Sequence, residues 1–264
     1  MKKIIYENKI DLVISDNRYG CWSKKIPCIF ICHQLNIQLP SGLKWLKPIV
    51  NYFHHRSIRK FTRCWVPDQT GEFSLTGKLS EGLSFPVKYI GILSRFRKTN
   101  AEIKYDLAVI LSGPEPQRSI LEEIIIKQIH NQNLKTVLVR GVIECEVTWK
   151  QEGNVMVVNY LESKQLEEVI NQSKLIIARS GYSAIMDLAR LGKRAIFIPT
   201  PGQTEQQYLG KKLMRDKIAL CLSQNKFVLS EAVKLSSEYS GFKEHLSNEL
   251  LIKAISESYP YEFI

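Results

Sequence analysis

Residues 178–208 constrain the fold of this chain more than any other segment. They read in order as the end of an apolar strand, a tight turn, a helix, a second apolar strand and a Pro/Gly loop that opens another helix. Strands that alternate with helices predict a parallel sheet with helices on both faces. Ligands bind such sheets at the carboxyl ends of the strands. We therefore expect a small-molecule site lined by the polar residues of this segment: Ser180, Gly181, Asp187, Gln206, Gln207.

The same alternation runs through most of the chain. Periodicity and turn residues predict strands at 11–15, 27–32, 63–67 and 87–91, then at 106–111, 136–140, 155–158, 175–178 and 195–199. Helices are expected at 42–63, before His130, at 163–171 with Ser163 as cap, and at 182–191, 205–215 and 230–238. The polar stretch 92–105 is predicted to link two domains, which we place at residues 1–98 and 99–264.

Length and cysteine content narrow the class of protein. A chain of 264 residues can form one large domain or two ordinary ones. It has no apolar run of about 18 residues or more, which a membrane-spanning helix requires. The six cysteines form no CxxC pair and no metal-ligand spacing, which favours a reduced cytoplasmic protein. Polar residues from Glu7 to Asp11 interrupt the amino-terminal apolar stretch and disfavour a signal peptide.

The net charge of +11 lies entirely in the first part of the chain. Residues 1–100 hold 17 Lys and Arg against 6 Asp and Glu, whereas residues 101–264 hold 20 of each kind. Residues 42–63 are the densest basic piece and also carry aromatic side chains, among them Trp45, Tyr52 and Phe53. Such a helix can dock on an anionic membrane, or it can bury its apolar face and leave a solvated basic face. No zinc-finger or RRM signature supports nucleic-acid binding.

Other polar residues also fall where strands are predicted to end. Ser112 and Gly113 begin the segment SGPEPQR between a strand and a helix, where free N–H groups suit a diphosphate, although a structural turn explains the segment equally well. Asp187 has the chemistry to accept ribose hydroxyls, or it lies on a solvated helix face. His33 follows a predicted strand and is either a base or a structural histidine, and Asp16 and Arg18 occupy a similar loop facing an acceptor.

Together these pieces resemble the glycosyltransferases of family 28. The matching residues are Arg179-Ser180-Gly181, an acid six positions after that glycine (Asp187, where the family has Glu), Pro199 and the pair Gln206-Gln207. The resemblance implies that Asp187 binds the ribose of a nucleotide and that the glutamines contact the donor sugar. It further implies acceptor-side contacts from His33 and Asn36. Donor-side roles are implied for residues upstream of this segment: Arg95 at the diphosphate, Ser112 and Gly113 in the Gly-rich loop, and Tyr160 and Leu161 at the uracil.

The family fold, GT-B, pairs two Rossmann-like domains. The resemblance implies an α/β protein whose carboxyl-terminal domain is a doubly wound parallel sheet and whose amino-terminal, acceptor-side domain is incomplete. The Gly-rich, His-containing loop that opens the amino-terminal domain in the family has no counterpart in these 264 residues. We therefore expect a naturally short or truncated member, with a sheet edge that is either prone to association or covered by a partner chain.

The function that follows as an expectation is hexosyl transfer from a UDP-sugar, with N-acetylhexosamine as the expected sugar, to an unknown acceptor hydroxyl. Helix dipoles and donors rather than a metal would stabilise the leaving diphosphate, and His33 is the candidate base. Two alternatives stay open: a UDP-sugar hydrolase or 2-epimerase of the same fold, and a non-catalytic donor-domain subunit of a two-chain enzyme. The expected location is the cytoplasm, with peripheral contact to the inner face of the membrane through residues 42–63.

Overall fold

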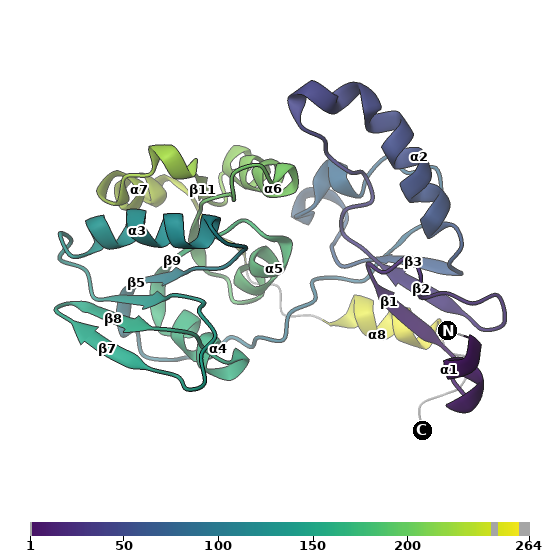
Figure 1. Cartoon of the computed structure of the whole chain (residues 1–264), viewed down its shortest axis with the longest axis horizontal. Coiled ribbons are helices and arrows are strands. Elements are labelled where there is room, and N and C mark those ends of the chain that lie inside the picture. The colour runs from purple at the N-terminus through teal and green to yellow at the C-terminus, as the bar shows by residue number, and fades with distance from the viewer. Residues whose placement is uncertain (1, 244–247, 259–264) are drawn as a thin grey trace. The chain divides into compact units, whose positions relative to one another are not determined.

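The protein, described by a computed structural model, is an α/β chain that forms two compact units (Figure 1). The structure describes residues 2–243 and 248–258, so residues 244–247 and 259–264 of the predicted second domain lie outside it. Unit 1 contains residues 2–93 together with 248–258, and unit 2 contains residues 94–243. Each unit is described by itself below.

Unit 1 is built on a four-stranded parallel sheet in the order β1-β2-β3-β4. The chain begins with the short helix α1 (Lys2–Glu7). A 3₁₀ turn, η1 (Ser41–Leu46), leads into α2 (Lys47–Ile58) between the second and third strands, which gives the expected βαβ crossover. The strands are β1 (Val13–Asp16), β2 (Cys28–Ile31), β3 (Arg63–Val66) and β4 (Lys88–Tyr89).

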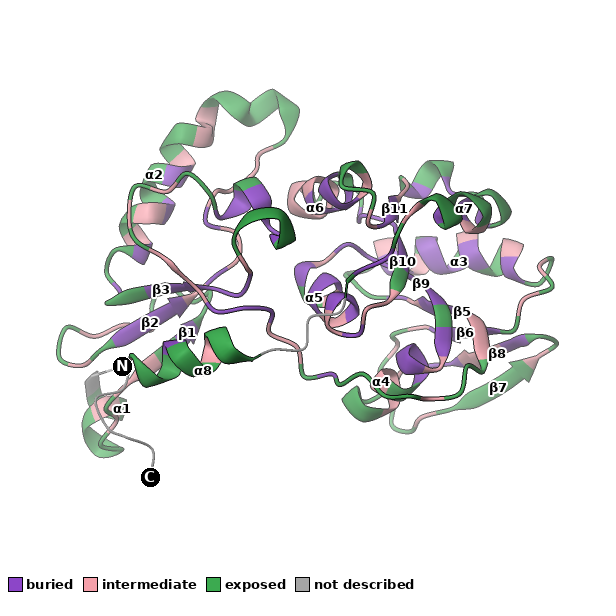
Figure 2. Cartoon of the chain, turned by 180° about the vertical axis from the view of Figure 1, so that it is seen from behind, coloured by how far each residue is buried: buried purple, intermediate pink, exposed green. Residues whose placement is uncertain are grey.

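Helices cover both faces of this sheet. On one face, Ile58 at the end of α2 packs in a buried cluster with Phe30 and Val66. On the other face, Ala254 of the carboxyl-terminal helix α8 (Glu249–Ser256) packs against Ile29 and Trp65. The strand interiors are accordingly buried, as Figure 2 shows for β2 and β3. The last described helix thus belongs to unit 1, whereas residues 99–264 were predicted to form one domain.

Unit 2 is a seven-stranded sheet in the order β11-β10-β9-β5-β6-β8-β7. Every strand pair is parallel except β7 with β8. The strands are β5 (Tyr105–Ile110), β6 (Thr136–Val139), β7 (Trp149–Glu152), β8 (Val155–Val158), β9 (Ser173–Ala178), β10 (Arg194–Phe197) and β11 (Leu220–Cys221). The helices are α3 (Gln117–Ile129), α4 (Ser163–Asn171), α5 (Tyr182–Arg190), α6 (Thr204–Arg215) and α7 (Leu229–Leu235).

The core of unit 2 lies on both sides of the sheet. Figure 1 shows α3 and α7 over one face, where Ile125 and Leu229 join a buried cluster with alternate strand residues such as Val109. The intervening residues Ala108 and Ile176 are also fully buried. Successive side chains of a strand point to opposite faces, so both faces are covered, as expected for a doubly wound sheet.

Several local features differ from the sequence-based expectation. The predicted linker docks on unit 2 from residue 94 onward: Phe96 is buried, and the backbone N–H of Thr99 donates to Asn171 Oδ1. Helix α4 is capped by Glu162, which forms a capping box with Gln165, and not by Ser163. The single helix expected at 42–63 is the 3₁₀ turn η1 followed by α2, which ends at Ile58. The strands β7 and β11 and the helices α1 and α8 were not predicted.

Candidate functional site

The carboxyl ends of three neighbouring strands bring the predicted donor-side segments together in unit 2. β10, β9 and β5 are adjacent in the sheet and parallel, so their carboxyl ends meet at one edge. β5 leads to Ser112 and Gly113, β9 leads to Ser180 and Gly181, and β10 leads to the loop before α6. The arrangement expected from the sequence is therefore present as a cluster of three loops.

Close contacts join these loops. Gly113 has a φ of +104°, and a β-carbon there would lie 3.7 Å from Thr200 Oγ1. The Ser180 hydroxyl donates to the carbonyl of Gln206 at 2.8 Å. The side chain of Gln206 is occupied within its own loop, because Oε1 accepts from Thr200 N and Nε2 donates to Gln203 Oε1. Ser180 and Gln206 therefore hold the loops in place.

A buried positive charge lies at the same edge. Arg179 is 2 % exposed, and its guanidinium donates to the carbonyls of Ile198, Pro199 and Gln117. Burial lowers the pKa of Arg179 to about 10, so the side chain remains charged at neutral pH. Its Nε has no hydrogen-bond partner. Sequence reasoning used Arg179 only as a motif residue and missed this charge.

Helix α5 begins at this edge with space in front of it. Gly181 is the N-cap of α5, which has no side-chain cap, and a β-carbon at Gly181 would meet nothing within 4 Å. The amino end of a helix carries partial positive charge and favours anions. The start of α5 and the buried Arg179 thus both favour a negatively charged group at the carboxyl edge.

Asp187 lies on α5 beside the segment that enters unit 2. Its Oδ1 accepts a 2.6 Å hydrogen bond from the hydroxyl of Ser94. Burial raises the pKa of the Asp187 carboxyl above its ordinary value, while the Ser94 hydrogen bond and the charge of Arg95 oppose this rise. Arg95 is exposed, and its guanidinium lies 5.3 Å from the centre of the Phe96 ring. Arg95 and Asp187, which were predicted to contact the diphosphate and the ribose, are therefore close together.

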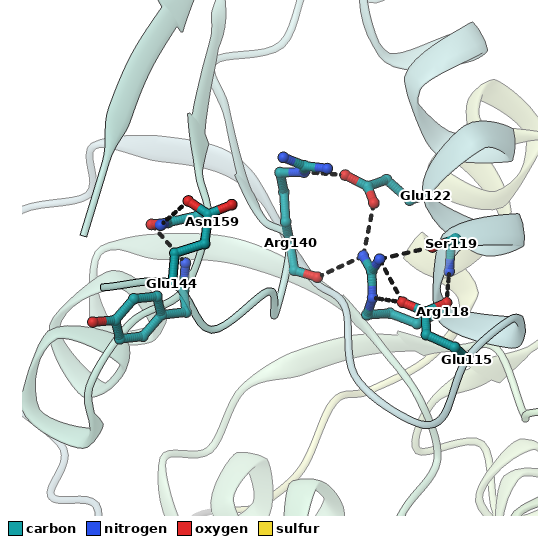
Figure 3. Close-up of polar contacts among 8 residues, drawn as sticks. Glu115, Arg118, Ser119, Glu122, Arg140, Glu144 and Asn159 are labelled. Carbon is teal, nitrogen blue, oxygen red and sulfur yellow. Dashed lines mark hydrogen bonds and ion pairs between the residues drawn. The ribbon is translucent and has the colours of Figure 1, made fainter. Parts of the chain in front are cut away.

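Tyr160 and Leu161 follow β8 and are half-buried. Asn159 organises the backbone around them: its Oδ1 accepts from the N–H groups of Thr148 and Tyr160, and its Nδ2 donates to Glu144 Oε2 at 2.9 Å. Figure 3 shows Asn159 facing Glu144. Asn159 was not predicted as a functional residue, because an amide after a strand is common in loops.

An ionic network with a buried centre fixes the loop between β5 and α3 (Figure 3). Arg118 is 8 % exposed; it donates to Glu122 Oε2 at 2.7 Å and to Glu115 Oε1 at 2.6 Å. Arg140, at the end of β6, contacts the other oxygen of Glu122. Arg118 therefore holds the segment SGPEPQR against the sheet, and its first five residues, Ser112 and Gly113 among them, are exposed.

The predicted acceptor-side residues lie in unit 1. Asp16 ends β1, Arg18 follows it, and His33 follows β2, so they share the carboxyl edge of two adjacent parallel strands. Asp16 and Arg18 are exposed and His33 is half-buried. The Asn36 carboxamide donates to the carbonyls of Lys78 and Glu81, so it has a structural use here.

A tyrosine–histidine pair that was not predicted joins the loops after β1 and β2. His54 Nε2 lies 3.0 Å from the carbonyl of Gln34, which can only accept, so Nε2 carries the proton. Nδ1 then accepts from the hydroxyl of Tyr19 at 2.7 Å. Burial lowers the pKa of His54 below its ordinary value, which favours this neutral form.

No helix among residues 2–243 and 248–258 is both long and apolar enough to cross a membrane. Within the same residues, no three His, Cys, Asp or Glu side chains lie together as metal ligands would.

The chain is similar to known glycosyltransferases in sequence. The family model for the glycosyltransferase family 28 C-terminal domain matches residues 117–248. A UDP-N-acetylglucosamine–N-acetylmuramyl-(pentapeptide) pyrophosphoryl-undecaprenol N-acetylglucosamine transferase from Sulfurihydrogenibium sp. (strain YO3AOP1) is 27% identical over 154 residues, which are 57% of this chain and 43% of that protein. The enzyme of that name from Rickettsia akari (strain Hartford) is 21% identical over 252 residues, 84% of this chain and 66% of that protein.

Coverage of these relatives is partial: the chain spans less than half the length of the first two curated proteins that it matches. Solved structures share its fold. MurG of Acinetobacter baumannii has a TM-score of 0.53 at 13% identity, covering 97% of this chain and 72% of MurG. The glycosyltransferase SnogD from Streptomyces nogalater has a TM-score of 0.60 at 12% identity, covering 97% and 75%. The fold is that of GT-B glycosyltransferases, and the chain belongs to glycosyltransferase family 28.

Proposed function

We propose that this chain binds a UDP-sugar at the carboxyl edge of unit 2 and transfers its hexosyl group to an acceptor hydroxyl. The observation that carries the proposal is the joining of the loops after β5, β9 and β10 around Gly113, Ser180 and Thr200. The name of the relatives supports N-acetylglucosamine as the sugar, which makes N-acetylhexosaminyl transfer the specific form of the proposal.

The geometry supports a division of labour along this edge. A diphosphate in front of α5 would face the amino end of that helix and lie near the charge of Arg179. Asp187 has one carboxylate oxygen bonded to Ser94, which leaves the other to accept from a ribose hydroxyl. Because the amide of Gln206 is occupied, Gln207 is the glutamine that would meet the sugar. Tyr160 and Leu161 would contact the uracil of the nucleotide.

Displacement at the sugar carbon breaks its bond to the diphosphate and leaves negative charge on the departing oxygen. In our proposal the α5 dipole and Arg179 stabilise that charge without a metal. Proton removal from the acceptor hydroxyl is assigned to His33, which lies at the carboxyl edge of unit 1. Its replacement by Gln is expected to lower kcat without changing the affinity for UDP.

Calorimetric titration tests the donor site. UDP and UDP-N-acetylglucosamine should both bind the full chain, and Asp187→Ala should weaken both by about tenfold or more, since a hydrogen bond to a charged group contributes about 1.5–3 kcal/mol. Asp106→Ala is the matched control, because Asp106 lies on β5 at the opposite, amino end of the strand and pairs with Lys174. Equal binding by wild type and Asp187→Ala, or no binding by either, would refute the assignment.

The two alternatives are separated by product analysis. Release of free sugar from UDP-N-acetylglucosamine without an acceptor favours a hydrolase or epimerase. A chain that binds UDP but shows no turnover by itself favours a donor-domain subunit, provided that turnover appears when a second protein chain supplies an acceptor domain.

A specific observation favours contact of unit 1 with an anionic membrane. No residue of η1 is buried, although it contains Leu43 and Trp45, which are 46% and 71% exposed. Ile49, Tyr52 and Phe53 on α2 are more than half exposed as well. We call these five residues the apolar patch. Lys44 and Lys47 lie among them and add positive charge. Apolar side chains that enter the headgroup region and basic residues that pair with lipid phosphates act together in such docking.

Vesicle sedimentation tests this contact. The chain should sediment with vesicles of phosphatidylglycerol and phosphatidylethanolamine but not of phosphatidylcholine alone, and Trp45→Ser with Phe53→Ser should release it. Ile143→Ser, at an isoleucine of unit 2 that is 86% exposed, should not. Sedimentation unaffected by the patch substitutions would contradict the proposed contact.

A further inference from the structure

Unit 2 contains a cavity between α3 and α6 that the proposed function does not use as a whole. Its volume is about 610 Å³, within the range of sites for small organic molecules. Ile120 and Ile124 of α3 form one wall and Met214 of α6 another, while residues 221–225, which begin at the last residue of β11, line the rest. Gln207 is the one predicted donor-side residue among those lining it.

The walls of this α3–α6 cavity are mainly apolar. Ile120 is 39% exposed, although it lies on a helix whose neighbouring apolar residues are buried in the core. Pro199 and Leu222 add further apolar surface. A hydrophobic ligand in the cavity would gain about 25 cal/mol for each Å² of apolar surface that both partners remove from water. A hexose, with a hydroxyl on nearly every carbon, would lose hydrogen bonds to water against such walls.

One of the lining residues holds a buried hydrogen-bond acceptor without a partner. Gln224 lines the cavity and is 7% exposed. Its Nε2 donates to Gln117 Oε1 at 3.2 Å, but its Oε1 has no hydrogen-bond partner. A buried acceptor that is left unsatisfied costs about 1–3 kcal/mol, which a ligand N–H or O–H would recover.

The charge of the cavity has one sign. Lys211 is the charged side chain among the described residues that line it, and no carboxylate among them neutralises it. Cys221 also lines the cavity, and burial raises the pKa of its thiol to about 11, so it is neutral at physiological pH. An anionic group on a ligand would therefore meet an uncompensated ammonium.

We propose that the α3–α6 cavity binds a small apolar acid, a compact hydrocarbon body that carries one hydrogen-bond donor and one anionic group. The hydrocarbon lies against Ile120, Ile124 and Met214, the donor bonds Gln224 Oε1, and the anion pairs with Lys211. This binding does not depend on the proposed glycosyl transfer, because most of the walls lie outside the predicted donor residues.

Indole-3-propionate is a suitable probe, since it combines an apolar ring, one N–H and one carboxylate. Calorimetric titration of the full chain without UDP should show saturable binding. Methylation of the indole nitrogen removes the donor, and the methyl ester removes the charge. Each change should weaken binding to the wild type about tenfold, the magnitude of one charge-assisted or previously unsatisfied hydrogen bond.

Four variants locate the binding site. Ile120→Trp fills the cavity and should abolish binding, whereas Ile126→Trp should not, because Ile126 lies on the same helix at 40% exposure but outside this cavity. In Lys211→Gln the methyl ester should bind as tightly as indole-3-propionate itself. In Lys234→Gln, a substitution on α7, the ester should still bind about tenfold more weakly than the acid. Lys211 is exposed, so its replacement tests the site even where Ile120→Trp disturbs folding.

The pairing with Gln224 has its own test. In Gln224→Leu, methylation of the indole nitrogen should no longer weaken binding, because the acceptor has been removed. Absence of saturable binding to the wild type, equal binding to Ile120→Trp and wild type, or a methylation penalty that persists in Gln224→Leu would overturn the proposal.

Discussion

Glu122 is the centre of the ionic network that holds the predicted diphosphate loop, so its neutralisation tests how that loop is positioned. The carboxylate is 5% exposed and contacts Arg118 with one oxygen and Arg140 with the other. Glu122→Gln keeps the shape of the side chain and removes its charge. Arg118 then stays buried with Glu115 as its remaining carboxylate partner.

The expected loss of stability follows from the burial of each partner. Removing one member of a fully buried ion pair costs about 3–5 kcal/mol. Here the side chain of Arg140 is 39% exposed and that of Glu115 is 56% exposed, so water and Glu115 compensate part of the lost charge. We expect a loss of about 2 kcal/mol in the free energy of unfolding of unit 2, which corresponds to a fall of about 4–8 °C in its melting temperature.

The two units make a global melting curve unsuitable for this measurement. Hydrogen exchange of peptides from β5, β6 and α3 during a thermal series reports unit 2 directly. Glu123→Gln is the matched control, because Glu123 is the next residue of α3 and is exposed; it should change stability by less than about 0.5 kcal/mol. Equal exchange in Glu122→Gln and Glu123→Gln would refute the assignment of the network as the element that holds the loop.

Two further predictions concern backbone and thiol chemistry. Gly141 has a φ of +72°, and a β-carbon there would lie 2.5 Å from the carbonyl oxygen of Leu111. Gly141→Ala should therefore lower the free energy of unfolding of unit 2 by about 1–3 kcal/mol in urea titration. Gly153→Ala should cost less, because Gly153 has a similar φ of +60° but open space around it. Equal losses for the two glycines would contradict the close approach. Iodoacetamide reacts with the thiolate, and burial raises the pKa of Cys221 to about 11. At pH 8 the reagent should therefore modify exposed Cys145 well before Cys221. The rate at which Cys221 is modified should rise as the pH approaches 11. Mass mapping that finds Cys221 modified first at pH 8 would contradict its burial.

The alternation of strands and helices was predictable from sequence because β5, β6, β8, β9 and β10 of unit 2 are short, mainly apolar runs between turn residues. β7 was missed because Trp149–Glu152 is an exposed edge strand with no apolar alternation to mark it. The grouping of α8 with unit 1 could not be read from its pattern, since an amphipathic helix does not indicate which sheet it covers.

The site was predictable to the level of its loops but not of its contacts. The strand-end positions of Gly113 and Ser180 follow from the order of elements. The use of the Gln206 amide within its own loop does not, because it depends on the position of Thr200. The contacts of Arg118 and Glu122 could not be predicted from their spacing on the helix, because Glu122 also contacts Arg140, which is distant in sequence.

Hydrogen exchange with and without UDP tests most directly whether the carboxyl edge of unit 2 is the nucleotide site. UDP should slow exchange in residues 111–117, 179–187 and 200–207. It should leave exchange unchanged at the amino edge of the same sheet, in residues 103–106 and 133–135, where a second hollow is lined by Asp106 and Lys174. Protection at the amino edge alone, or no protection in any of these segments at saturating UDP, would contradict the proposed donor site.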